Sequence, residues 1–150
     1  MLEKLIVDES RITACLLQAY QLRVKELCFL PLGADRDTAV YRVLAADDQS
    51  CFLKLRSGRF IPALTAFPEY LQKQGISHIL SPIRNASGGL QTKLDHFKMI
   101  LYPFIEGQNA YQIKMTALQK IELGKTLRRI HSYIPPQESV KGVPSERFSN

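Results

Sequence analysis

The feature that most constrains this sequence is a short apolar strand that carries one lysine. Residues 51–55 read Cys-Phe-Leu-Lys-Leu and directly follow the turn-forming stretch 47–50, Asp-Asp-Gln-Ser. Because side chains alternate along a strand, Lys54 is predicted to share one face with Phe52 and Arg56, while the other face is apolar. Two interpretations of Lys54 stay open: a solvated lysine on an exposed sheet face, or an ammonium aimed at phosphates.

The strand patterns around this stretch predict one antiparallel sheet. Three consecutive strands are joined by short turns, which favours a meander, and a second hairpin follows later in the chain. We expect about five strands and an α+β fold from the candidate segments Val24–Leu30, Thr38–Leu44, Cys51–Arg56, Ile79–Ile83, Leu90–Leu94 and Phe97–Ile105.

Three segments have helical periodicity: residues 8–20, 62–74 and 115–134. Asp8 or Ser10 can cap the first, and Thr116 the third. Pro68 is expected to kink or divide the second helix. Gly124 falls on the apolar stripe of the third, where close contact with another helix could offset its cost of about 1 kcal/mol. Residues 135–150 are too poor in apolar side chains to order themselves and are predicted to be a loose tail.

Composition narrows the classes of protein. The net charge is +6, but the basic residues are dispersed, and no nucleic-acid-binding signature is present. No apolar run approaches the roughly 20 residues that span a bilayer. The three cysteines show no paired spacing, which suggests reduced thiols in the cytoplasm. The three histidines are too dispersed to predict a metal site. A basic domain that binds nucleic acid ranks last among the interpretations and would bind with steep salt dependence.

Two further stretches have site-like chemistry. In the turn that holds Gly33, Asp35, Asp37 and Thr38, backbone amides could surround a phosphate; an ordinary Asp-rich turn is the alternative. The stretch 99–107 is an apolar strand that runs into Pro103. Because proline has no N–H, the neighbouring carbonyl and amide could pair with a planar base; an edge strand that ends in a turn is the alternative.

The order of these features resembles the N-terminal half of the aminoglycoside phosphotransferase family, which has the protein-kinase-like fold. The resemblance covers roughly residues 8–134. It rests on the combination of Gly33-Ala34-Asp35, Phe52-Leu53-Lys54-Leu55, Gly75-Ile76, Ser81-Pro82-Ile83, the segment 94–98, Tyr102-Pro103-Phe104-Ile105, Leu123-Gly124-Lys125 and Ile130-His131. It implies ATP as the nucleotide and a hydroxyl of an aminoglycoside or aminocyclitol as the acceptor.

The resemblance also implies roles for individual residues. Lys54 would hold the α- and β-phosphates of ATP, and the turn with Gly33, Asp35, Asp37 and Thr38 would lie over them. The Pro103 carbonyl and the Ile105 amide would pair with the adenine edge, with Tyr102 near the back of the base pocket.

The sequence departs from the family pattern in two places. Residues 62–66 hold no acid to pair with Lys54. Two alternatives stay open: Lys54 is less well oriented than in the family, or Glu69 substitutes for the missing acid. The family's His-x-Asp-x-x-x-x-Asn loop and its magnesium-binding Asp segment are not found in the 150 residues. We therefore expect no catalytic residue and no metal ligand here, and magnesium only together with a C-terminal lobe.

These expectations define a domain plan: a nucleotide-binding lobe over 1–106, a hinge and first helix of a truncated second lobe over 107–134, and the tail 135–150. The rival interpretation is a non-catalytic module that binds nucleotide weakly or docks on a separate lobe. It predicts an exposed apolar face on helix 115–134, through which the chain could self-associate.

Overall fold

The computed structural model describes residues 7–31, 37–108, 110–140 and 142–143. The chain divides into two compact units, one of Met1–Phe60 and Ser81–Phe104, the other of Ile61–Leu80 and Ile105–Asn150. The sheet lies in the first unit. The predicted boundary at residue 106 stays a prediction.

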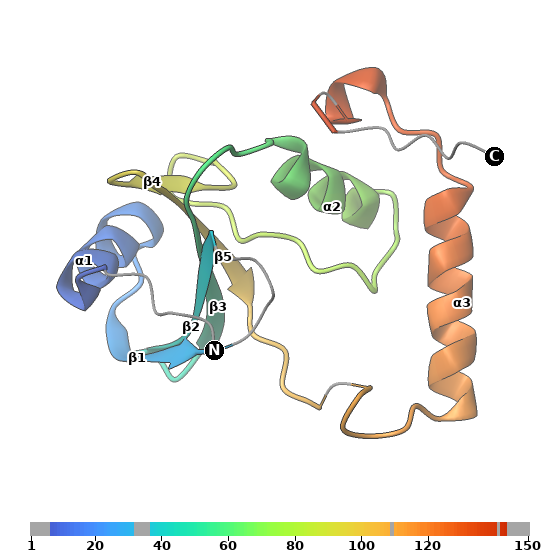
Figure 1. Cartoon of the computed structure of the whole chain (residues 1–150), viewed down its shortest axis with the longest axis horizontal. Coiled ribbons are helices and arrows are strands. Elements are labelled where there is room, and N and C mark those ends of the chain that lie inside the picture. The colour runs from blue at the N-terminus through green and yellow to red at the C-terminus, as the bar shows by residue number, and fades with distance from the viewer. Residues whose placement is uncertain (1–6, 32–36, 109, 141, 144–150) are drawn as a thin grey trace. The chain divides into compact units, whose positions relative to one another are not determined.

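The first unit contains one five-stranded antiparallel sheet in the order β1-β2-β3-β5-β4 (Figure 1). The strands are β1 (Val24–Leu30), β2 (Thr38–Ala45), β3 (Ser50–Arg56), β4 (Thr92–Leu94) and β5 (Phe97–Pro103). The predicted meander of three strands, the second hairpin and the α+β class are confirmed.

The prediction of a strand over Ile79–Ile83 was wrong. In the described chain this segment forms no strand, although the Ile83 amide donates to the Leu101 carbonyl at 2.7 Å. β4 already pairs with β5 from Phe97 to Met99, so the segment meets β5 beyond that pairing, at the Leu101 carbonyl. This single hydrogen bond does not form a strand ladder.

The core lies between the sheet and α1 (Glu9–Tyr20), the helix packed on the sheet (Figure 1). α1 begins after Asp8, whose carboxylate accepts from the Ser10 amide at 2.9 Å. Two of its side chains, Ile12 and Leu16, are fully buried against the sheet. Their partners are alternate residues of β2, β3 and β5, chiefly Ala39, Tyr41, Val43, Cys51, Leu53, Leu55, Met99 and Leu101.

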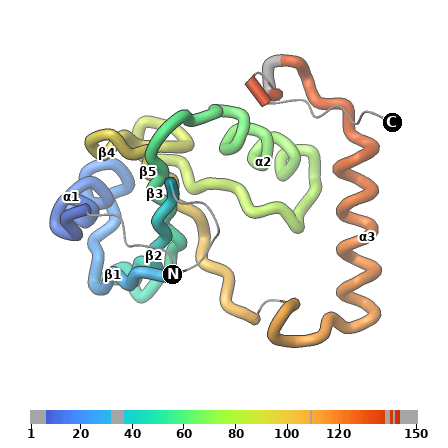
Figure 2. Tube along the Cα trace, in the orientation of Figure 1, coloured from blue at the N-terminus to red at the C-terminus, as the bar shows by residue number. Residues whose placement is uncertain are grey.

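The second unit contains α2 (Ala63–Lys73), α3 (Ala117–His131) and the 3₁₀ turn η1 (Gln137–Val140), traced in Figure 2. α2 continues through Pro68, so the expected division into two helices was wrong. Proline at this position removes a donor only from the Leu64 carbonyl in the first turn, and Leu64 is partly exposed. The stretch predicted as a loose tail contains η1, which contacts α2.

Thr116 caps α3 as predicted, in a reciprocal capping box. The Gln119 amide donates to Thr116 Oγ1 at 3.2 Å, and the Thr116 amide donates to Gln119 Oε1 at 2.8 Å. The expected close helix contact at Gly124 is not found, because beyond the adjoining backbone of α3 an added Cβ would meet no heavy atom of the described chain within 4 Å. None of the helices in the described ranges is long and apolar enough to cross a bilayer.

Candidate functional site

Lys54 lies on the side of β3 that faces away from α1. Its strand neighbours Leu53 and Leu55 are fully buried in the core, while Phe52, Lys54 and Arg56 are half-buried on the other face. This is the division of faces predicted from the sequence. Because β3 is an inner strand with β2 and β5 on either side, the backbone that carries Lys54 is fixed by ladders on both edges.

The immediate neighbours of Lys54 are aliphatic. Across the sheet it stands opposite Val40 of β2 and Ile100 of β5, which are 5% and 3% exposed. Within the described residues, no hydrogen bond or ion pair is found for the Lys54 side chain. Its methylene stem can therefore rest on apolar surface while the ammonium reaches beyond it toward water or an anion.

The predicted phosphate turn adjoins the Lys54 end of the sheet. Thr38 begins β2 opposite Arg56, two residues from the Val40–Lys54 pair, which is about 7 Å along the strand. The Asp37 carbonyl accepts from the Ser57 amide at 2.8 Å and from Ser57 Oγ at 3.3 Å, so β2 and β3 stay paired past their ends. Gly33 and Asp35 lie outside the described residues.

Aromatic side chains gather at the other end of the same face. Tyr102 of β5 stands opposite Phe52, with ring centroids 6.3 Å apart in an edge-to-face arrangement. Burial raises the pKa of the Tyr102 phenol above its usual value of 10.0, with a smaller contribution from Tyr20. The Arg42 guanidinium lies 4.5 Å from the centre of the Phe104 ring and also donates to Ser50 Oγ at 3.1 Å.

The outer edge of β5 has an acceptor at Pro103. Residues of a strand direct their amide and carbonyl to alternate edges, and the Phe104 amide donates inward to the Ser50 carbonyl at 3.3 Å. The Pro103 carbonyl is therefore directed outward. On that edge Phe97 and Met99 pair with β4, and the Leu101 carbonyl accepts from Ile83. Pro103 is the next outward residue of β5, and it is exposed.

The structure thus brings Lys54, Thr38, Tyr102 and Pro103 into one sheet, with Asp37 at its end. Ile105 belongs to the second unit and is 69% exposed. Glu69 forms an ion pair with Lys73 one turn on in α2, at 3.0 Å. Its replacement of the family glutamate stays a prediction.

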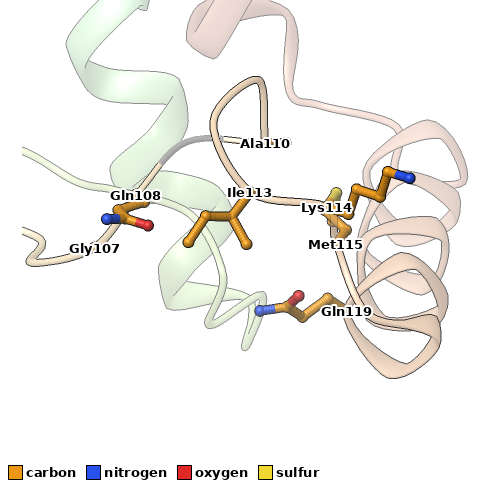
Figure 3. A pocket seen from close by; sticks show the side chains of 7 residues that line it. All are labelled: Gly107, Gln108, Ala110, Ile113, Lys114, Met115 and Gln119. Atoms are coloured by element: carbon orange, nitrogen blue, oxygen red, sulfur yellow. The ribbon is translucent and has the colours of Figure 1, made fainter.

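The sequence interpretation missed two features. One is the cross-strand contact of Phe52 with Tyr102, which could have been found by pairing the two strands. The other is a cavity of about 540 Å³ after the hinge, with Gln108, Ile113 and Gln119 in its lining. Figure 3 shows the Gln119 amide, on α3, extending toward Ile113, while the Lys114 side chain turns away.

The described residues contain no cluster of three or more His, Cys, Asp or Glu side chains that could hold a metal ion.

Comparisons with known proteins relate this geometry to a fold. No protein-family model matches the sequence, and no curated protein matches it. Among solved structures, spectinomycin phosphotransferase APH(9)-Ia in complex with ADP and spectinomycin superposes with a TM-score of 0.87 at 29% identity. The match covers 97% of this chain and 44% of that one. The chain has the fold of an aminoglycoside phosphotransferase N-terminal lobe.

Two more structures extend the comparison. The AMP-bound complex of spectinomycin phosphotransferase matches with a TM-score of 0.77 at 27% identity, over 90% of this chain and 40% of that one. Amicoumacin kinase hAmiN, solved with AMP-PNP and Ca²⁺, gives 0.53 at 13% identity, over 87% and 56%, and shows the fold alone. The chain therefore spans less than half the length of the spectinomycin phosphotransferase structures that it matches, and the predicted resemblance is confirmed for this kinase-like lobe.

Proposed function

We propose that this chain is the nucleotide-binding lobe of an ATP-dependent phosphotransferase that acts on a hydroxyl of an aminoglycoside or aminocyclitol. The observation that carries the proposal is the placement of Lys54 and the outward Pro103 carbonyl on neighbouring strands. The fold that holds these two groups matches, over 97% of this chain, a phosphotransferase solved with ADP and spectinomycin.

The proposal gives each part of the sheet a role. Lys54 holds the α- and β-phosphates, and the turn of Gly33, Asp35, Asp37 and Thr38 covers them. The Pro103 carbonyl and the Ile105 amide pair with the adenine edge, and Tyr102 closes the back of the base pocket. Ile100, the partner of Lys54, is three residues from Pro103 along β5, about 10 Å, which leaves room for a ribose between base and phosphates.

Phosphoryl transfer needs more than this lobe supplies. The acceptor hydroxyl must be oriented by a base, and magnesium must neutralise the charge that develops on the phosphates. We assign both tasks to a C-terminal lobe like the unmatched part of the solved relatives. We propose that this phosphotransferase acts in the cytoplasm and inactivates an antibiotic there.

A titration of ADP against residues 1–150 tests the assignment of Lys54. Replacing Lys54 with Ala removes a charge-assisted contact to phosphate, so the dissociation constant should rise about tenfold or more. Lys93→Ala is the matched control, because Lys93 is exposed on β4 and outside the proposed site. Isothermal calorimetry of the three proteins gives the comparison.

If wild type and Lys54→Ala bind ADP with equal affinity, and circular dichroism shows that both are folded, Lys54 is not part of the site. A loss of affinity of the same size in Lys93→Ala would show that net charge, and not the position of Lys54, governs binding.

A second candidate function is favoured by the surface of α3. In this helix only Thr126 is buried, while Leu118, Ile121, Leu123 and Leu127 are 46–75% exposed. A non-catalytic module that docks on a separately supplied lobe would carry such a face, and the isolated chain would self-associate through it.

A further inference from the structure

Phe104 connects the two backbone groups that are proposed to pair with adenine. It follows Pro103, whose carbonyl is directed outward from β5, and it precedes Ile105, whose amide is the second proposed partner. The Pro103 carbonyl and the Phe104 amide belong to one planar peptide, so a restraint on Phe104 also fixes the direction of that carbonyl. Phe104 is the last residue of its segment in the first unit.

The backbone restraint on Phe104 is a long hydrogen bond. The Phe104 amide donates to the Ser50 carbonyl at 3.3 Å, whereas an amide–carbonyl bond is typically about 2.9–3.0 Å long. The paired register of β3 and β5 ends one residue earlier, at Cys51 and Pro103. A bond of this length at the end of a ladder is weak, so the direction of the hinge peptide depends on further contacts of Phe104.

The side chain of Arg42 supplies such a contact. Its guanidinium lies 4.5 Å from the centre of the Phe104 ring, and its Nη2 donates to Ser50 Oγ at 3.1 Å. Ser50 therefore accepts from the hinge peptide through its carbonyl and from Arg42 through its hydroxyl. These contacts join residues from β2, β3 and the end of β5 in a closed loop. We call Arg42, Ser50 and Phe104 the hinge clamp.

The strand register explains why Arg42 reaches Ser50. Arg42 stands opposite Phe52 of β3, two residues from the Leu44–Ser50 pair, which is about 7 Å along the strands. A diagonal neighbour at this distance on the same face is within reach of a long side chain. Arginine suits the position because its planar guanidinium can stack on a ring with its face while its edge donates hydrogen bonds.

Arg42 is on the same face of the sheet as Lys54, so direct contact with phosphate is the alternative role. The register places Arg42 two residues from Val40, the partner of Lys54, on the side toward the aromatic end of the face. Thr38 and the predicted phosphate turn lie on the other side of Lys54. The guanidinium is directed along the sheet to the other members of the hinge clamp. The geometry therefore favours a role at the base over a role at the phosphates.

We propose that Arg42 is a positioning residue for adenine. The hinge clamp holds Phe104 so that the Pro103 carbonyl keeps the direction in which it can accept from an amino group, and this favours adenine over a purine with a carbonyl in that place. The inference rests on the proposed function and adds Arg42 to its site. The amino group of adenine is a donor, which suits a carbonyl. Hypoxanthine has a carbonyl instead, and two acceptors that face each other leave both without a partner.

The affinities for ADP and for inosine diphosphate, which has hypoxanthine in place of adenine, measure this preference. By calorimetry, wild type should bind ADP about tenfold or more tighter than inosine diphosphate. Arg42→Ala should weaken ADP binding about fivefold and change inosine diphosphate binding by less than about twofold, so the ratio of the two dissociation constants should fall. Arg23→Ala removes the same charge from an exposed position just before β1 and should leave the ratio unchanged.

Two further variants show whether Arg42 acts through Phe104. Phe104→Leu keeps an apolar side chain but removes the ring beside the guanidinium, so it should lower the ratio by a similar factor. Adding Arg42→Ala to Phe104→Leu should lower it little further, because both changes break one contact. Ser50→Ala removes only the hydroxyl and is a milder variant, which should lower the ratio in the same direction.

Hydrogen exchange of the Phe104 amide gives a readout without nucleotide. Exchange should quicken in Arg42→Ala and stay as in wild type in Arg23→Ala, because only the first loosens the end of the β3–β5 ladder. The amide of Leu53, which is fully buried in the middle of β3, should stay protected in both variants and shows that the sheet is intact.

An equal loss of affinity for both nucleotides in Arg42→Ala would assign Arg42 to the phosphates or to net charge and overturn the proposal. So would equal wild-type affinities, an unchanged ratio, unchanged exchange at Phe104, or an effect of Arg42→Ala that is undiminished in Phe104→Leu. Lys54→Ala should weaken both nucleotides equally and leave the ratio unchanged. If wild type binds neither nucleotide, the proposed function fails and the adenine preference with it, while the exchange of the Phe104 amide still decides whether Arg42 holds the hinge peptide.

Discussion

At the scale of single residues, burial distinguishes neighbours that look alike in the sequence. Leu16 and Leu17 are adjacent in α1, yet Leu16 is fully buried against the sheet and Leu17 is 50% exposed. In β3, successive side chains lie on alternate faces, so Lys54 is on the face away from Leu53 and Leu55, and this much was predictable from strand periodicity. The near-complete burial of Val40 and Ile100 beside Lys54 was not, because it depends on which strands become its neighbours.

The two leucines of α1 give a matched pair of stability variants. Leu16→Ala should lower the free energy of unfolding by about 2–5 kcal/mol, because it leaves a cavity under the sheet. Leu17→Ala should change it by about 0.5 kcal/mol or less. Urea denaturation of both measures the difference, and similar losses would contradict the position of α1 on the core.

Asp8 gives a pH-dependent prediction. Its pKa is held below the ordinary value of 3.8, chiefly by hydrogen bonding with Ser10, so the ionised carboxylate is the form that stabilises α1. That contribution is fully present above the ordinary pKa and is lost as the pH falls through the lowered value.

We therefore expect Asp8→Asn to have a lower urea midpoint than wild type near neutral pH, since asparagine caps without a charge at the helix N-terminus. The gap should narrow as the pH falls below the ordinary value of 3.8 and through the lowered pKa. A gap that does not change with pH would assign the effect to packing.

At the scale of elements, the sequence predicts what local chemistry dictates and fails where tertiary pairing decides. Thr116 and Gln119 form the capping box of α3 within four residues, so the start of this helix was predictable. Ile79–Ile83 has the composition of a strand, but β4 occupies the edge of β5 that it would need. Pro68 is tolerated because it removes a donor only from a carbonyl near the start of α2.

The capping box can be tested by removing its hydroxyl. Thr116→Ala should destabilise the start of α3 by about 1 kcal/mol, since the Gln119 amide loses its acceptor. Thr116→Ser keeps the hydroxyl and should retain most of the helix. Hydrogen exchange at the Gln119 amide reports the change, and equal protection in both variants would show that the box does not hold the helix start.

At the scale of the whole molecule, the proposed division of labour predicts binding without transfer. Residues 1–150 should bind ADP but transfer no phosphate from ATP to spectinomycin, because no catalytic Asp loop accompanies Lys54. A radiolabel transfer assay measures this. Turnover that disappears in Lys54→Ala would show that the lobe is sufficient and would refute the division.

The outward edge of β5 has a consequence for solubility. An open strand edge is a template on which another chain can add, and such addition begins aggregation. Here β4 and the Ile83 amide occupy the edge as far as Leu101, and the next outward position is a proline, which has no N–H to donate. The residue proposed to present a carbonyl to adenine therefore also prevents the sheet from growing through that edge.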